Sequence, residues 1–168
     1  QSIGNEILPD NQERLMCVLH PGFYNKERKV FTYETDREST AYIPANKGEH
    51  YFMGGFNGGV SSDYLKLIAT LKDNIETDLI NNKIAIWHDE SHLNAYLLEK
   101  NKKILTPSYG YPEGWDLPYP PKVLILDKTK WGGHEKLRGT TNKTSYFGFF
   151  KRLFDCLLIR PHYEKRKR

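Results

Sequence analysis

The chain lacks long apolar runs: none of about 18 residues, the length that a membrane helix needs, occurs in its 168 residues. It has only two cysteines, Cys17 and Cys156, whose wide separation makes no disulfide framework and fits a reducing compartment. The opening QSIGNEILPD has neither the basic nor the apolar part of a secretory leader. These features argue against a helical membrane span and a disulfide-stapled domain, and we expect a cytoplasmic protein.

Two familiar site motifs are also missing. MGGFNGG (53–59) is rich in glycine but has neither the GK[ST] ending nor the GxGxxG spacing of a phosphate loop. In WHDESHLN (87–94), His88 and His92 stand four apart as in zinc proteases, but Asp89 occupies the place of the catalytic Glu. At about 100° per residue, Glu90 would point roughly away from His88. We therefore exclude a zinc-protease site and assign no residue to a metal.

The composition predicts a folded domain with a basic end. Hydrophobic residues make up 38% of the chain, 11 residues are tyrosine, and the net charge is +4. Much of the positive excess lies in the final KRKR, after the apolar stretch FGFFKRLFDCLLI (147–159). We expect a main body over residues 1–143 and a basic amphipathic tail over 144–168. The tail would lie peripherally on an anionic inner membrane or pack on the domain.

Helices and strands alternate in the predicted secondary structure. A helix is expected over 62–80, where apolar residues recur at helical spacing: Leu65, Ile68, Leu71, Ile75 and Leu79. A second helix should begin at Asp89 or Glu90 and run to Lys100. Strands are expected at 29–34, 49–56, 83–87, 103–105 and 122–127. This order predicts an α/β fold with a mixed sheet and flanking helices.

Polar and aromatic groups gather where the expected strand 83–87 meets the second helix. Ligands of open α/β sheets collect at such strand ends. Glu90 lies in the first helical turn, where the helix dipole favours a carboxylate, which suits a nucleophile or charge stabiliser. The structural alternative is that Asp89 is an N-cap, Glu90 compensates the dipole and Trp87 is a core residue. In HPGFY (20–24), Pro21 and Gly22 predict a turn.

Several motifs, taken together, resemble glycosyltransferase family 6, the retaining α1,3-transferases of the histo-blood-group A/B and α1,3-galactosyltransferase type. The matching segments are HPGFY (20–24), FTYE (31–34), AYIP (41–44), YFMGGFNGG (51–59), WHDESHLNAYLL (87–98) and, more loosely, ILTPSY (104–109). The resemblance implies the acceptor-binding and catalytic half of a GT-A fold. The donor-nucleotide half, with its DxD or NxN motif, would lie upstream of Gln1, so dependence on Mn²⁺ stays open.

The resemblance also implies roles for individual residues. Glu90 would be the catalytic carboxylate. Trp87 would pack on the acceptor galactose, and His20 and Thr32 would contact acceptor hydroxyls.

Donor contacts are implied as well. Asp89 and His88 would lie at the donor sugar, and Lys130 and Arg138 would hold the UDP pyrophosphate. The segment Met53, Gly54 and Gly55 would shape the pocket around C2 of the transferred sugar. The family's GalNAc-transferring enzyme has Leu-Gly-Gly here and its Gal-transferring enzyme has Met-Gly-Ala. Glycine at position 55 therefore predicts a preference for UDP-GalNAc over UDP-Gal.

The resemblance predicts a bacterial-type enzyme that moves GalNAc or Gal from a UDP-sugar to O3 of a fucosylated β-galactoside. An alternative is a lectin-like module that keeps the acceptor site but does no chemistry. A nucleic-acid partner, suggested only by the basic end, fits the aromatic and aliphatic content least well.

Overall fold

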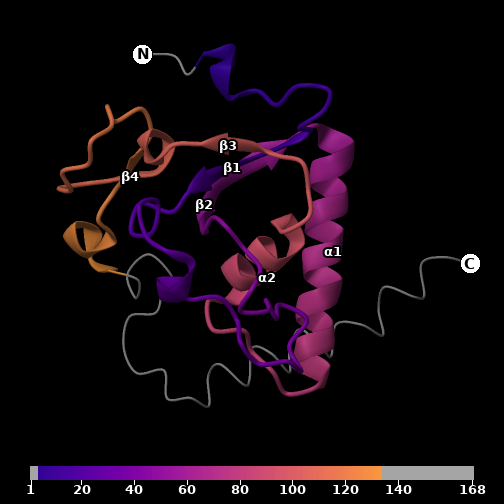
Figure 1. Cartoon of the computed structure of the whole chain (residues 1–168). Helices are drawn as coiled ribbons and strands as arrows, with labels where there is room; N and C mark the ends of the chain where they lie inside the picture. The colour runs from indigo at the N-terminus through magenta and orange to yellow at the C-terminus, as the bar shows by residue number, and fades with distance from the viewer. Residues whose placement is uncertain (1–3, 134–168) are drawn as a thin grey trace, which may run out of the picture. The chain divides into compact units, whose positions relative to one another are not determined.

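The computed structural model describes residues 4–133 (Figure 1). The chain divides into two units, residues 1–126 and 127–168, which we describe separately. The first unit contains all five strands and both α-helices found within the described residues. The described part of the second unit contains one short 3₁₀ helix, η4 (Lys128–Trp131).

A mixed sheet of three strands forms the centre of the first unit (Figure 1). The middle strand, β1 (Leu15–Leu19), pairs antiparallel with β2 (Phe52–Gly59) and parallel with β3 (Lys103–Leu105). The predicted mixed α/β class is thereby confirmed. The strand β1 was not predicted, because LMCVL is an uninterrupted apolar run without the alternation that marks a half-buried strand.

The strand β2 carries a large bulge at its glycines. Cys17 pairs with Asn57 and Leu19 with Phe52, so residues 53–56 of β2 lie opposite the single residue Val18 of β1. Gly54 and Gly55 fall within this bulge, as glycines in strand interiors often do. The backbone between residues 53 and 56 is thus free to turn toward other partners.

Both predicted helices are present. The first, α1, spans Ser61–Ile80 and the second, α2, spans His88–Leu97, three residues shorter at its end than expected. They cover the sheet with a shared apolar cluster, in which the buried members are Leu15, Cys17, Phe52, Leu67, Leu93 and Leu97. Burial of this cluster supplies the apolar contacts that hold the helices on the sheet.

The apolar stripe that predicted α1 is only partly buried. Its members Leu65, Ile68 and Leu79 are 65%, 46% and 39% exposed. Of the stripe, Leu71 packs on the core cluster, beside Tyr64 and the buried Leu67, which the stripe did not include. Helical periodicity identified the element correctly, but the neighbouring elements decide which side of the helix they cover.

Two strand predictions were wrong and one was too long. Residues 29–34 form a short 3₁₀ helix, η2 (Arg28–Val30), followed by extended chain without a ladder partner. Residues 83–87 form no strand because the amide of Ile86 is bound by the Glu34 carboxylate, 2.8 Å away, and Ile84 and Ile86 are exposed. The expected strand 122–127 shortens to β5 (Leu124–Ile125), which pairs in parallel with β4 (Tyr111–Pro112).

Two further 3₁₀ turns complete the described elements of the first unit: η1 (Asn5–Ile7) and η3 (Pro107–Gly110). Within residues 4–133 no helix combines the length and apolarity needed to span a bilayer. The predicted boundary at residue 143 and the predicted membrane-binding tail, 144–168, lie outside the described residues.

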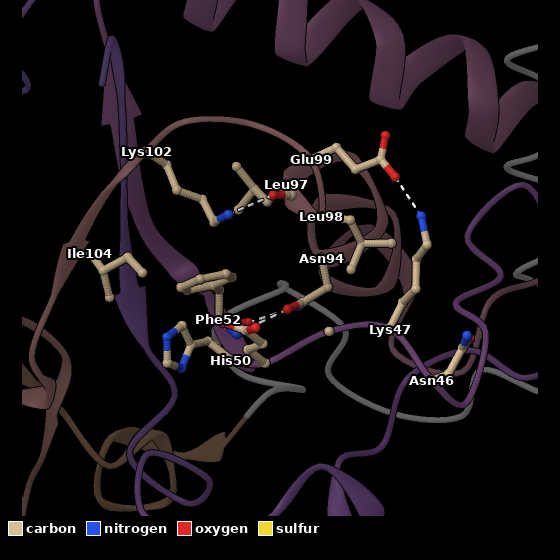
Figure 2. Close-up of a pocket in the computed structure, with 12 residues that line it drawn as sticks. Asn46, Lys47, His50, Phe52, Asn94, Leu97, Leu98, Glu99, Lys102 and Ile104 are labelled. Carbon is tan, nitrogen blue, oxygen red and sulfur yellow. Dashed lines mark hydrogen bonds and ion pairs between the residues drawn. The ribbon is translucent and has the colours of Figure 1, made fainter. Parts of the chain in front are cut away.

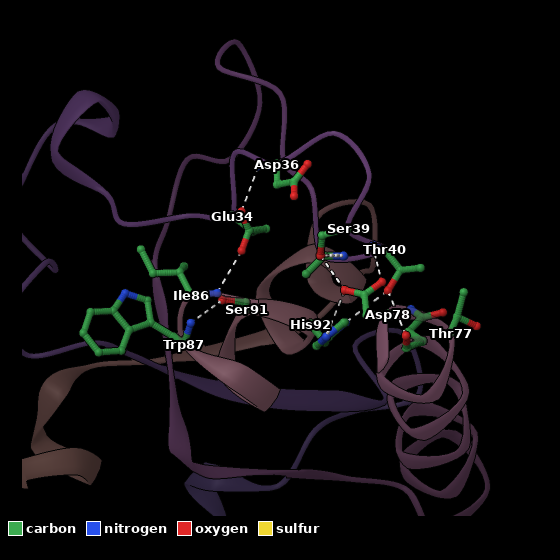
Figure 3. A network of polar contacts seen from close by, with 12 residues as sticks. Glu34, Asp36, Ser39, Thr40, Thr77, Asp78, Ile86, Trp87, Ser91 and His92 are labelled. Atoms are coloured by element: carbon green, nitrogen blue, oxygen red, sulfur yellow. Dashed lines mark hydrogen bonds and ion pairs between the residues drawn. The ribbon is translucent and has the colours of Figure 1, made fainter. Parts of the chain in front are cut away.

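A buried polar network joins α1 to α2 (Figure 3). The Asp78 carboxylate accepts hydrogen bonds from the Ser39 hydroxyl at 2.6 Å and the Thr40 amide at 2.8 Å. Burial raises the pKa of Asp78, but these hydrogen bonds and His92 outweigh it and leave the pKa lowered. The His92 ring lies 3.7 Å from Asp78, and Thr40 Oγ1 lies 3.4 Å from His92 Nδ1. His92 is therefore a structural anchor of α2.

This network predicts a loss of stability under mild acid. Burial lowers the pKa of His92, against the opposing influence of Asp78, Asp89 and Glu34. The unfolded chain then takes up a proton near pH 6.5 more readily than the folded chain does. The stabilisation that depends on neutral His92 should be fully present above about pH 6.5 and be lost progressively as the pH drops below that value.

Urea unfolding of the full-length protein at pH 7.5 and 5.5 measures this loss. His92→Gln should lose less stability between the two values than the wild type, whereas the exposed control His50→Gln should lose as much as the wild type. Equal losses in all three proteins would contradict the assignment.

Candidate active site

The carboxylate of Glu90 is held at a fixed place between α2 and β2. Its Oε2 accepts the Gly54 amide at 2.7 Å, and its Oε1 accepts the Tyr51 hydroxyl at 3.1 Å. Gly54 can donate because it lies in the bulge, where β2 departs from its ladder with β1. Glu90 is partly exposed and lies in the first turn of α2, as predicted. Both carboxylate oxygens are therefore oriented while the group remains accessible.

Tyr51 is fixed in turn by a cluster of aromatic rings. Tyr33 stacks on it with ring centres 5.2 Å apart, and the ring centres of Phe23 and Phe31 lie 4.7 and 5.9 Å from that of Tyr51. Burial, the largest influence, raises the pKa of Tyr51, and the neighbouring Glu90 raises it further. Tyr51 thus stays protonated at neutral pH and can donate its hydrogen bond to the carboxylate.

Asn94 fastens α2 to β2 one helical turn after Glu90. Its side chain accepts from the Phe52 amide and donates to the Phe52 carbonyl, both at 2.9 Å. The same Nδ2 donates to the backbone carbonyl of Glu90 at 2.9 Å. Asn94 is 2% exposed, so these bonds are shielded from water. They fix the distance between α2 and β2 at the point where Glu90 reaches Gly54.

Trp87 presents a half-exposed indole next to this site. Its ring is 49% exposed, and its Nε1 donates to Thr32 Oγ1 at 2.8 Å, so two residues predicted to bind acceptor lie together. The backbone beneath it is bound by side chains: Ser91 Oγ accepts the Trp87 amide at 3.0 Å, and Glu34 accepts that of Ile86 (Figure 3). The alternative reading of Trp87 as a core residue is wrong.

His20 lies beside Tyr51, with ring centres 5.7 Å apart. Its amide donates to the Tyr51 carbonyl at 2.8 Å, and its Nδ1 accepts the Gly22 amide at 3.0 Å in the predicted HPGFY turn. Burial lowers the pKa of His20, although Glu90 acts in the opposite direction. With Nδ1 accepting, the neutral ring carries its proton on Nε2, which can donate to a hydroxyl group.

His88 and Asp89 are both exposed at the start of α2. His88 has a φ of 51°, in the left-handed region that side chains other than glycine rarely adopt. His92 points instead into the buried Asp78 network, so the two histidines do not share a site. Among residues 4–133, no group of three or more His, Cys, Asp or Glu side chains is placed to hold a metal ion.

The segment 53–55 divides between core and surface. Met53 is buried among Val18, Leu105 and Tyr109, whereas Gly55 is exposed. A Cβ at position 55 would lie 3.1 Å from the Met53 methyl, so the two positions interact directly. A Cβ at position 54 would lie 3.3 Å from that of Glu90, which leaves little room for a side chain there.

Neither predicted pyrophosphate ligand belongs to the unit that contains Glu90. Lys130 is exposed in η4, which belongs to the second unit. Arg138 lies outside the described residues. Their predicted role stays a prediction.

A sequence model of Glycosyltransferase family 6 matches residues 1–135. The chain belongs to glycosyltransferase family 6. Its mixed sheet with two helices is compatible with a glycosyltransferase of this family.

Curated relatives from two animals and a bacterium support the assignment to this family. The chain is 43% identical over 117 residues to histo-blood group ABO system transferase 1 of Rattus norvegicus, covering 67% of this chain and 32% of the relative. It is 34% identical over 126 residues to globoside alpha-1,3-N-acetylgalactosaminyltransferase 1 of Gallus gallus, covering 73% and 34%. It is 32% identical over 124 residues to the O-antigen biosynthesis glycosyltransferase WbnI of Escherichia coli, covering 73% and 53%. The chain thus spans about a third to a half of the length of these relatives.

A cavity of about 450 Å³ lies near the family motif without including Glu90 or Trp87 (Figure 2). Phe52, Asn94 and Lys102 line it, and the ion pair of Lys47 with Glu99 lies at it. Lys102 donates to the Leu97 carbonyl at 2.7 Å and so binds the end of α2. The candidate site is therefore the surface around Glu90 and Trp87, and this cavity shares Asn94 with it but is lined by neither of those two residues.

Sequence reasoning missed two residues of this site, Tyr51 and Asn94. Asn94 stands four residues after Glu90 in WHDESHLN, so its place on the same side of the helix was a usable signal. Tyr51 lies directly before β2, and only the folded chain shows that its hydroxyl reaches Glu90.

Removal of the Asn94 side chain should destabilise the protein. Asn94→Ala leaves the buried Phe52 amide and carbonyl without partners, at a cost of about 3 kcal/mol in the free energy of unfolding. Asn101→Ala is the matched control, because Asn101 makes one exposed bond, to the Gln12 carbonyl, and its loss should cost under about 0.5 kcal/mol.

Urea unfolding of the full-length protein gives both free energies, and hydrogen exchange at the Phe52 amide reports the local bond. Unchanged exchange at Phe52 in Asn94→Ala would show that Asn94 does not hold β2.

Proposed function

We propose that this chain is the acceptor-binding and catalytic half of a retaining α1,3-glycosyltransferase with a GT-A fold. It would transfer GalNAc, in preference to Gal, from a UDP-sugar to O3 of a fucosylated β-galactoside. The observation that carries the proposal is the accessible Glu90 carboxylate, fixed by Tyr51 and Gly54 next to the exposed indole of Trp87.

The chemistry of transfer explains why such a carboxylate is useful. When the bond from the sugar to UDP breaks, positive charge develops at the anomeric carbon. A carboxylate whose oxygens are already oriented stabilises that charge without further reorganisation. Glu90 would act there as nucleophile or as charge stabiliser, and Asp89 and His88 would bind the donor sugar.

The surroundings of Glu90 support binding of a sugar acceptor. An exposed indole offers an apolar surface to the apolar side of a galactose ring. Thr32 and the Nε2 proton of His20 would then contact hydroxyl groups and set the orientation of the ring. Lys130 and Arg138 remain the proposed partners of the leaving pyrophosphate.

Glu90→Gln tests the catalytic role directly. We expect kcat to fall at least about 100-fold with the affinity for UDP-sugar nearly unchanged, because the negative charge matters mainly in the transition state. UDP release by the full-length protein with fucosylated lactose as acceptor measures the change, and the exposed Glu99→Gln serves as control. Turnover of Glu90→Gln within a few-fold of wild type would reject the assignment. A wild-type protein that binds acceptor but releases no UDP would be a lectin.

Gly55→Ala tests the donor preference. The added methyl would stand 3.1 Å from the Met53 methyl and intrude where the N-acetyl group is proposed to fit. The variant should shift preference toward UDP-Gal by about 1 to 3 kcal/mol, the usual effect of one carbon in a pocket. The ratio of kcat/KM for the two donors decides it, with the unfolding midpoint as a check on folding. A wild-type preference for UDP-Gal would overturn the proposal.

A further inference from the structure

A chain of three hydrogen bonds leads from the exposed indole to the carboxylate. Trp87 Nε1 donates to Thr32 Oγ1 at 2.8 Å, and Thr32 Oγ1 donates to the Tyr51 hydroxyl at 3.4 Å. Tyr51 then donates to Glu90 Oε1 at 3.1 Å. The members come from three segments that are far apart in the sequence, so the chain exists only in the folded protein.

The direction of this chain is set by the chemistry of its ends. An indole nitrogen can only donate, and an ionised carboxylate can only accept. Each hydroxyl between them has one proton to donate, so Thr32 donates its hydrogen bond to Tyr51, and Tyr51 donates its own to Glu90. In a reversed arrangement the indole N–H would face another donor, or the carboxylate would face another acceptor.

The remaining contacts make Tyr51 the rigid part of the chain. Its ring is 2% exposed and stacks on Tyr33, and its backbone carbonyl accepts the His20 amide. Thr32 and Trp87, by contrast, are partly or largely accessible. A ligand on the accessible end therefore acts on Glu90 through a hydroxyl that cannot move away.

We propose that Tyr51 is a positioning residue that couples the acceptor-binding pair, Thr32 and Trp87, to the orientation of the Glu90 carboxylate. The proposal rests on the proposed function, in which Glu90 acts on the donor sugar and Trp87 receives the acceptor. An acceptor hydroxyl that displaces the indole from Thr32, or competes with it, changes the hydrogen bond that Tyr51 offers to Glu90. Binding of an acceptor would thus change the orientation of the Glu90 carboxylate.

The sharpest test is the slow hydrolysis of UDP-sugar by the full-length protein when no acceptor is present. A residue that only contacts acceptor cannot affect that reaction. The coupling predicts that Thr32→Val slows hydrolysis about threefold and that Tyr51→Phe slows it about tenfold, the usual effect of a lost hydrogen bond to a charged group, with donor KM unchanged.

The double variant separates a connected chain from two independent effects. Thr32→Val combined with Tyr51→Phe should hydrolyse donor no more slowly than Tyr51→Phe alone, because Thr32 acts through the Tyr51 hydroxyl. Independent effects would multiply to about thirtyfold. Tyr111→Phe is the matched control, since it removes a tyrosine hydroxyl that binds the Trp115 carbonyl outside this chain of hydrogen bonds and should leave hydrolysis unchanged.

A second measurement does not need activity. The Gly54 amide donates to Glu90 Oε2, so its nitrogen and proton chemical shifts report the orientation of the carboxylate. Both Thr32→Val and Tyr51→Phe should move this resonance, and Tyr111→Phe should not. A Gly54 resonance unmoved in Thr32→Val, or hydrolysis at the wild-type rate in that variant, overturns the coupling. A wild-type protein without transfer or hydrolysis overturns the proposed function instead, while the Gly54 resonance still tests the hydrogen-bond chain.

Discussion

The site depends on the attachment of α2 to the bulged part of β2. Where β2 leaves its ladder with β1, backbone groups lose their strand partners and must find others. Glu90 supplies one at Gly54, and just before the bulge Asn94 binds the backbone of Phe52, which still pairs with Leu19. The bulge, the start of α2 and the orientation of the carboxylate are therefore one arrangement, and a change in any of them alters the other two.

A second constraint comes from polar groups buried between the helices. Asp78 and His92 are almost completely inaccessible, and the loop residues Ser39 and Thr40 satisfy the carboxylate between them. A buried carboxylate without such partners would cost several kcal/mol, so the loop and both helices must form together. This network holds the face of α2 that carries His92 against α1, while Glu90 and Asn94, on another face, hold the helix to β2.

Local signals in the sequence predicted what local interactions determine. The two helices, the turn at Pro21 and Gly22 and the position of Glu90 in a first helical turn all depend on neighbours within a few residues. The contacts of Tyr51 with Glu90 and of Thr32 with Trp87 join residues 39 and 55 apart, and no periodicity reveals them. The resemblance to the family supplied Thr32 and Trp87, but not the hydrogen bond between them.

The wrong strand predictions have the same cause. Residues 29–34 and 83–87 have strand-like composition, yet the Glu34 carboxylate binds the Ile86 amide in place of a ladder partner. The apolar stripe of α1 was correct as a sign of a helix, but its members Leu65, Ile68 and Leu79 are exposed, whereas Leu71 packs on the core. Hydrophobic patterns indicate that an element forms, whereas long-range polar contacts decide where its backbone bonds go.

The left-handed backbone of His88 shows how the site uses these long-range contacts. Such a conformation costs a residue with a Cβ about 1 to 2 kcal/mol. It lets the chain enter α2 sharply, so that Trp87 stays outside the helix and its indole can reach Thr32. The bonds from Ile86 to Glu34 and from Trp87 to Ser91 oppose relaxation of this turn. Strain in the backbone is thus held in place by side chains on both sides of it, which is how a large aromatic ring can remain half exposed beside a fixed carboxylate.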